Sequence, residues 1–126
     1  HPVGAAVALE NIKIIEERDL IINAAERGVE LQTGLAKFSD HPLVGEVRGV
    51  GLVAALELVA PEGRATDFLP GKMGAQMNSI MLRNGLISRN MTDAMAFCPP
   101  LIVSSPEISD VLNVVSKSLN DLSAEI

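Results

Sequence analysis

Arg89 is the residue whose type and position in this sequence are best suited to chemistry. It follows Gly85 and the short run of residues 86–88, so we expect a short strand that ends at the arginine. Loops at the ends of rigid elements commonly carry binding residues, and a guanidinium binds a carboxylate through two parallel hydrogen bonds. Arg89 is therefore a candidate carboxylate-binding residue. The alternative is a surface arginine that pairs with Asp93 and has only a structural role.

Residues 49–54 match the pattern G-x-G-x-x-A, in which the glycines let a dinucleotide pyrophosphate approach a helix N-terminus. That pattern requires a helix after the glycines, but Pro61 interrupts the segment and no acidic residue follows at the expected distance of about 20 residues. We therefore interpret it as strand, turn and strand. A dinucleotide-binding fragment is the alternative, and a strand over residues 52–59 would exclude it.

The remaining candidate residues favour structural roles. Arg48 lies in an apolar stretch, and we expect it to pair with an acidic neighbour. His1 and His41 are far apart and each precedes a proline, a pattern that does not predict a metal site. Cys98 precedes two prolines at an expected strand end, so we expect a small buried hydrophobic residue there rather than a nucleophile. A single cysteine forms no internal disulfide and fits a reducing, cytoplasmic setting.

The spacing of apolar residues predicts the elements that must position these side chains. The charged cluster at residues 16–19 predicts a break or kink in the first helical segment, which is then two helices or one bent helix, and Asp19 is the expected N-cap of its second half. The last helix is expected to have Ser105 as N-cap and Pro106 at its first position. The expected helices cover residues 3–38, 71–84 and 106–122, and the expected strands lie within 44–59, 86–89 and 94–98.

The order α(α)-ββ-α-ββ-α predicts an α/β domain of two layers, with helices on a small antiparallel-type sheet. Residues 52–59 are largely apolar at both alternating sets of positions, which predicts a central strand covered on both faces. With 126 residues, the chain is expected to form one domain.

The composition excludes several classes of function. The chain has 10 basic against 16 acidic side chains and a net charge of −6, with three Phe and neither Tyr nor Trp, which argues against nucleic-acid binding. Its apolar runs are interrupted by charges well before the ~18 residues of a membrane span, so no membrane association is expected.

The mean hydropathy of +0.29 is high, which suggests apolar surface that something outside this chain covers. The start at His1 without an initiator Met also suggests a fragment of a larger protein.

Several segments together resemble the C-terminal part of class III aminotransferases. These are fold type I pyridoxal-phosphate enzymes that include the omega-amino acid and amine:pyruvate transaminases. The resemblance extends over nearly the whole chain, in the family's order and spacing. It is carried by residues 1–10, 44–52, 85–89 and 97–102, and by Glu107-Ile108.

The resemblance implies that residues 1–126 are the small C-terminal domain of a larger aminotransferase that moves an amino group between an amine or amino acid and a keto acid such as pyruvate. The missing large domain and the second subunit of a homodimer would complete the site. In the amine:pyruvate subgroup, the arginine that matches Arg89 binds the substrate carboxylate and swings away for uncharged groups. Arg89 is thus the expected substrate-binding residue.

The resemblance also implies pyridoxal 5'-phosphate as the cofactor of the parent enzyme. The family's lysine segment precedes this region, and none of the chain's lysines matches it (Lys13, Lys37, Lys72 and Lys117). We therefore expect no catalytic residue in this fragment, no tight cofactor binding and no turnover by the fragment alone. The alternative is a stand-alone ferredoxin-like module that binds a small ligand or dimerises through its sheet.

Overall fold

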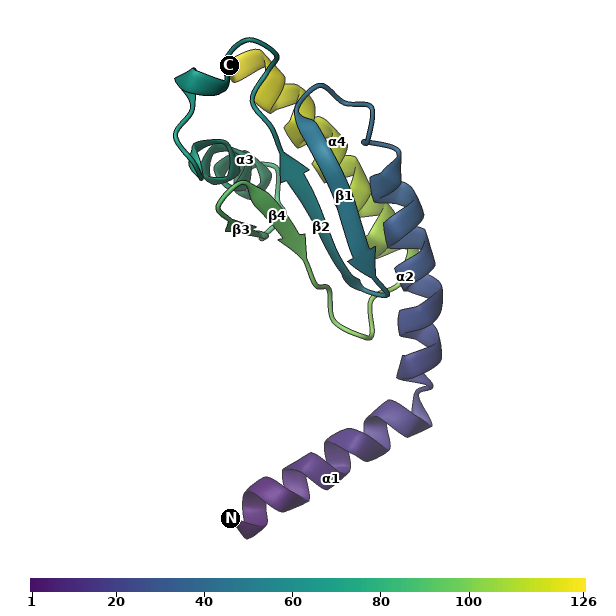
Figure 1. Cartoon of the computed structure of the whole chain (residues 1–126). Helices are drawn as coiled ribbons and strands as arrows, with labels where there is room; N and C mark the ends of the chain where they lie inside the picture. Colours follow the sequence, from purple (N-terminus) through teal and green to yellow (C-terminus); the bar gives the residue numbers. More distant parts are fainter.

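The body of the molecule has two layers, an antiparallel sheet and helices packed on one of its faces (Figure 1). The computed structural model describes residues 1–126, except for the side chain of Thr66. The helices are α1 (Pro2–Glu17), α2 (Leu20–Ala36), α3 (Lys72–Arg83) and α4 (Ser105–Glu125), with a short 3-10 helix at Ala65–Asp67. The strands are β1 (Val44–Val50), β2 (Val53–Leu58), β3 (Arg89–Met91) and β4 (Ala94–Phe97). The predicted α/β two-layer class and element order are confirmed.

The sheet has the strand order β1-β2-β4-β3, and each neighbouring pair is antiparallel. Leu56 of β2 pairs with Met95 of β4, and both side chains are fully buried on the helix-covered side. The next residues along these strands point the other way, and Val53 of β2 is 56% exposed. The expectation that β2 is covered on both faces is therefore wrong, because the helices of this chain pack on one face only.

Helix α1 projects away from the rest of the molecule as an extended arm (Figure 1), and none of its residues is buried. The predicted break between α1 and α2 is confirmed at Arg18 and Asp19. Asp19 occupies the N-cap position with a left-handed backbone (φ 48°), and its side chain makes no capping hydrogen bond within the described chain. Asp19 is thus the N-cap residue as predicted, but its side chain does not cap the helix, and its left-handed backbone turns the chain between α1 and α2.

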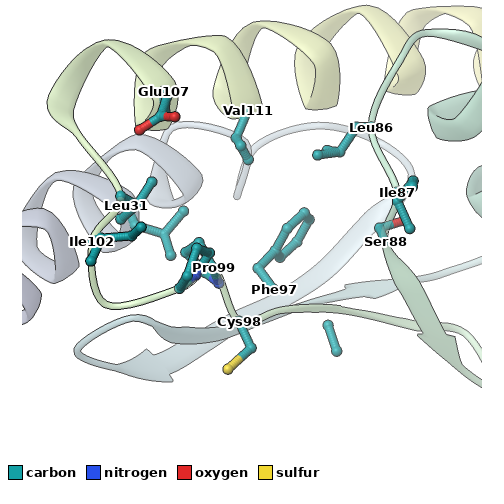
Figure 2. Close-up of a pocket in the computed structure, with 13 residues that line it drawn as sticks. Leu31, Leu86, Ile87, Ser88, Phe97, Cys98, Pro99, Ile102, Glu107 and Val111 are labelled. Carbon is teal, nitrogen blue, oxygen red and sulfur yellow. The ribbon is translucent and has the colours of Figure 1, made fainter. Parts of the chain in front are cut away.

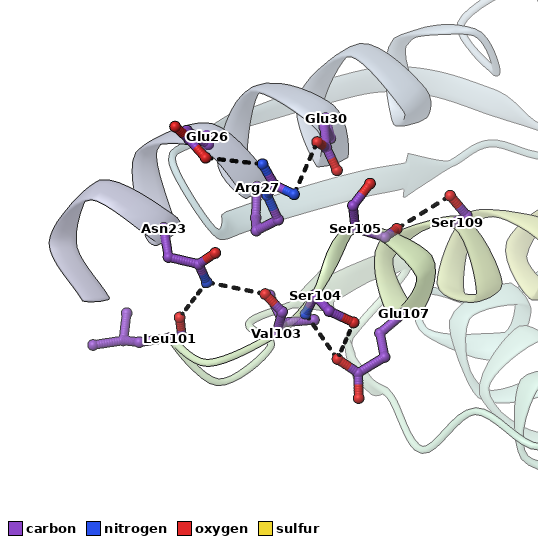
Figure 3. A network of polar contacts seen from close by, with 10 residues as sticks. All are labelled: Asn23, Glu26, Arg27, Glu30, Leu101, Val103, Ser104, Ser105, Glu107 and Ser109. Carbon is purple, nitrogen blue, oxygen red and sulfur yellow. Dashed lines mark hydrogen bonds and ion pairs between the residues drawn. The ribbon is translucent and has the colours of Figure 1, made fainter. Parts of the chain in front are cut away.

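Helix α4 begins one residue earlier than the sequence pattern predicted. Ser104, not Ser105, is its N-cap, and the Glu107 carboxylate accepts hydrogen bonds from both the backbone and the hydroxyl of Ser104 (Figure 3). This capping box requires a glutamate three residues after the cap, a spacing that Ser104 satisfies and Ser105 does not. The preceding loop is held on α2 by Asn23, whose amide donates to the carbonyls of Leu101 and Val103.

The core lies between the sheet and the helices. Apolar residues at helical spacing on α4 meet those of α2 and α3, as the period of the sequence predicts. Asn84, at the C-terminal end of α3, donates to Ser118 and Asp121 of α4, which joins these two helices. Of the helices in the described chain, none combines the length and apolarity needed to cross a membrane. The fully buried members of the core include Leu31, Leu35, Leu56, Met77, Met81, Met95, Val115 and Leu122.

Candidate functional site

We call the uncovered side of the sheet the open face. It carries a cross-strand row of four residues. Arg48 pairs with Ala55, Ala55 with Ala96, and Ala96 with Arg89, so one arginine stands at each edge of the sheet. Directly opposite residues in antiparallel strands point to the same side. The small alanines form the floor of a shallow groove of about 500 Å³, whose lining also includes Arg48, Glu57, Met91 and Thr92.

Arg48 is an arginine with its charge already compensated. Its Nη1 lies 3.0 Å from Oε2 of Glu46, and its Nη2 lies 2.9 Å from Oε2 of Glu57. The hydrogen bond to Glu57 is the main cause that raises the pKa of Arg48 above its ordinary value. The prediction that Arg48 pairs with an acidic neighbour is confirmed.

Arg89 is exposed at the start of β3, and none of the described side chains forms an ion pair with its guanidinium. Asp93, its expected structural partner, is engaged elsewhere. The Asp93 carboxylate accepts hydrogen bonds from the backbone N–H groups of Gly71 (2.7 Å) and Gly74 (2.8 Å). The alternative of an Arg89–Asp93 surface pair is therefore wrong.

The position of Arg89 in its strand also differs from the prediction. Arg89 begins β3 and does not end it, because pairing with β4 starts at Arg89 opposite Ala96. Residues 86–88 form the connection from α3, and Ser88 donates a hydrogen bond to Asn78 of that helix. This bond directs the connection along α3 before the chain joins the sheet.

A second, apolar cavity of about 400 Å³ lies between α2, α4 and the end of β4 (Figure 2). Phe97 stands inside it, facing Leu86 and Val111. Glu107 also lines the cavity, but its carboxylate accepts hydrogen bonds from the backbone N–H and the hydroxyl of Ser104. The cavity thus offers mostly apolar contact and no free charge from Glu107.

Cys98 is exposed, and its sulfur points away from Phe97 (Figure 2). The expectation that Cys98 is a small buried hydrophobic residue is wrong. Phe97 faces the helices, and neighbouring residues of an extended chain point to opposite sides. Cys98 is therefore directed to the uncovered side.

The dinucleotide-binding alternative is excluded, because residues 53–58 form strand β2 where that motif requires a helix. Gly51 provides the turn between β1 and β2 with a φ of 55°. His41 has a local structural role as well, since its Nδ1 accepts a hydrogen bond from the backbone N–H of Leu43 (3.2 Å). In the described part of the chain, His, Cys, Asp and Glu side chains form no group of three suited to a metal.

Comparison with known proteins supports a single family. The model of the family described as aminotransferase class-III matches residues 1–119. The chain is 42% identical to the putrescine–pyruvate aminotransferase of Pseudomonas aeruginosa, over the whole chain and 28% of that protein. It is 40% identical to the diaminobutyrate–2-oxoglutarate transaminase of Halomonas elongata, over 95% of the chain and 26% of that protein.

Solved structures agree with this family. A transaminase with L-Ala superposes with a TM-score of 0.94 at 50% identity, over 99% of this chain and 29% of the other. The omega transaminase of Pseudomonas jessenii in complex with PMP superposes with a TM-score of 0.93 at 46% identity, over 100% of this chain and 28% of the other. The chain belongs to the class III aminotransferase family. It spans between a quarter and a third of the length of these relatives.

The lysines of this chain do not fit the cofactor of the family. A pyridoxal phosphate enzyme needs a lysine amine directed at the cofactor inside the active site, whereas all four lysines here are exposed. Lys13 lies beside Glu10 and Glu17, Lys72 donates to a backbone carbonyl, and Lys117 donates to Asn84. The described residues therefore do not supply the imine-forming amine, and we assign no chemical step to this chain.

Proposed function

We propose that residues 1–126 are the C-terminal small domain of a larger pyridoxal 5'-phosphate-dependent aminotransferase. The parent enzyme would move an amino group between an amine or amino acid and a keto acid such as pyruvate. Family membership over residues 1–119 supports this proposal, as does the quarter to third of each relative's length that the chain covers. The cofactor and its lysine would belong to the rest of the parent enzyme.

The parent would be a cytoplasmic homodimer in which the rest of the chain and the second subunit complete the site. The apolar side chains on the exposed arm α1 support a covering partner, since contiguous exposed apolar surface usually marks an interaction site. Exposed side chains of this kind are Val3, Val7, Leu9 and Ile12. The source protein should accordingly have a mass several-fold above 13.3 kDa and absorb visible light. A colourless protein of 13.3 kDa would overturn the proposal.

Arg89 is the residue of this domain that would bind the substrate carboxylate. The observation that carries this assignment is its exposed guanidinium on the open face, without an ion-pair partner among the described residues, while Arg48 on the same row is paired twice. A hydrated guanidinium binds a carboxylate through charge-assisted hydrogen bonds and stays in water when the substrate has none. The domain would therefore distinguish substrates that carry a carboxylate from those that do not.

The test compares Arg89→Ala with the unaltered full-length parent enzyme in the donor half-reaction, without added keto acid. Two donors are used, L-alanine with a carboxylate and putrescine without one. Loss of charge-assisted hydrogen bonds worth about 1.5–3 kcal/mol should lower kcat/KM for L-alanine by roughly ten- to hundredfold. The value for putrescine should change by less than about twofold, as for an interaction that this donor never makes.

Arg83→Ala is the matched control, because Arg83 pairs with Glu125 on the helix layer and is absent from the open face. Arg83→Ala should leave the ratio of kcat/KM for L-alanine to kcat/KM for putrescine unchanged. An equal loss for both donors in Arg89→Ala would show that Arg89 does not recognise the carboxylate.

A further inference from the structure

The strand that carries Arg89 is short and lies at the sheet edge. β3 has three residues and pairs with β4 only, from Arg89 opposite Ala96 to Met91 opposite Ala94. A short edge strand held on one side is weakly fixed by its ladder alone. Other contacts must therefore determine where the guanidinium of Arg89 stands.

Asp93, in the turn that follows β3, supplies the main contact of this kind. Helix α3 has Gly71 at its N-cap, a residue without a side chain to accept hydrogen bonds from the unpaired N–H groups of the first turn. Both oxygens of Asp93 take this role. Oδ2 accepts from Gly71 N at 2.7 Å and Oδ1 accepts from Gly74 N at 2.8 Å.

The tip of the β3–β4 hairpin also fits closely against this helix end. A Cβ at Gly74 would lie 1.9 Å from the carbonyl oxygen of Thr92, so only glycine permits this approach. The backbone carbonyl of Asp93 accepts from Leu58 N of β2 at 2.9 Å. Asp93 thus joins the hairpin, the central strand and the first turn of α3.

Another attachment to α3 lies on the other side of Arg89. Ser88, the preceding residue, donates to Asn78 at 3.0 Å. Arg89 therefore stands between two attachments to the same helix, and that helix is anchored in the core by Met77 and Met81, which are fully buried.

We propose that Asp93 is a positioning residue for Arg89, holding the β3–β4 hairpin on the N-terminus of α3 so that the guanidinium meets the substrate carboxylate in a fixed direction. This inference rests on the proposed role of Arg89. The same hydrogen bonds keep the Asp93 carboxylate occupied. A released Asp93 would instead be a nearby anion that competes with the substrate for the guanidinium.

The experiment uses the full-length cofactor-loaded enzyme, with L-alanine and putrescine as donors in the half-reaction. Asp93→Ala should raise KM for L-alanine about tenfold, within the range that misplacement of a binding group by about 1 Å produces. Asp93→Asn keeps one oxygen acceptor and should restore part of the loss. Putrescine kinetics should change by less than about twofold in both variants.

A readout independent of activity is amide hydrogen exchange at Gly71 and Gly74, which should become faster in Asp93→Ala because both N–H groups lose their acceptor. Asn84→Ala is the matched control for helix stability. It removes the bonds to Ser118 and Asp121 at the opposite end of α3. It should lower the Tm while leaving the ratio of the two donors unchanged.

The double variant Arg89→Ala/Asp93→Ala separates this inference from the proposed function. If Asp93 acts through Arg89, Asp93→Ala should not change the ratio of kcat/KM for L-alanine to that for putrescine once Arg89 is removed. An unchanged ratio in Arg89→Ala alone would overturn the proposed function and this inference with it. A changed ratio in Arg89→Ala, combined with an unchanged ratio or an equal loss for both donors in Asp93→Ala, would overturn this inference only.

Discussion

Arg48 and Arg89 show how neighbours decide the role of a residue. Both belong to the same cross-strand row on the same face of the sheet. Arg48 has Glu46 two residues away on its own strand and Glu57 diagonally across on β2, and it pairs with both. The cross-strand partner of Arg89 is Ala96, and the next residue on the same side of β3 is Met91, so neither neighbour is acidic. The guanidinium of Arg89 therefore has no ion-pair partner among the described residues.

The capping box of α4 gives a pH-dependent prediction at this scale. Hydrogen bonds from Ser104 to the Glu107 carboxylate lower the pKa of Glu107 below its ordinary value of 4.5. A carboxyl group whose pKa is lower in the folded state stabilises the fold above its unfolded pKa, and this contribution is lost as the pH falls through the folded pKa. Glu107→Gln should therefore lower the urea midpoint at pH 7, and the difference from wild type should shrink as the pH falls below 4.5.

Glu62→Gln is the control for this measurement, because Glu62 is exposed in the loop after β2. Ser104→Ala removes the other half of the box and should cost about 1 kcal/mol of unfolding free energy at neutral pH. A Glu107→Gln effect that is the same at every pH would contradict the assignment to the charged carboxylate.

At the scale of elements, α2 packs against the β1–β2 turn through Gly28. A Cβ at Gly28 would lie 2.6 Å from both Cα and the carbonyl carbon of Gly51, which are backbone atoms. Helix propensity alone predicts that Gly→Ala stabilises a helix by up to about 1 kcal/mol. The clash should reverse this sign, so we expect Gly28→Ala to destabilise the fold by about 1–3 kcal/mol in urea unfolding.

Gly4→Ala is the matched substitution, because a Cβ at Gly4 of α1 meets nothing within 4 Å. It should leave the unfolding midpoint unchanged or raise it. Stabilisation by Gly28→Ala would show that α2 and the turn do not make the close contact.

At the scale of the whole molecule, a large apolar surface lies outside the core. Val7 and Ile12 of α1 are 64% and 52% exposed, and Val50 at the end of β1 is 79% exposed. The isolated chain should therefore self-associate, and light scattering at ~0.1 mM should give a mass above 13.3 kDa, since even a micromolar contact forms at this concentration. Val7→Lys combined with Ile12→Lys should lower that mass, whereas a monomeric wild-type chain would contradict the prediction.

Much of the fold was predictable because it depends on local patterns. The period of the apolar residues predicted the main helical segments and the order of helices and strands along the chain. Gly85 follows the C-cap of α3 and has a φ of 92°, the left-handed conformation that glycine commonly adopts just after a helix. The Ser104-x-x-Glu107 spacing is also a local signal, and it would have placed the start of α4 correctly.

The sequence by itself determined the element order, the resemblance to the family and the candidate status of Arg89, since each depends on residue types at short spacing. Only the tertiary structure decided that Asp93 caps α3 and that Arg89 has no ion-pair partner among the described residues, because Gly71 lies 22 residues from Asp93. It also decided that Cys98 is exposed and that one side of β2 is open. Such outcomes depend on which segments meet in space, and no pattern within a single element specifies that.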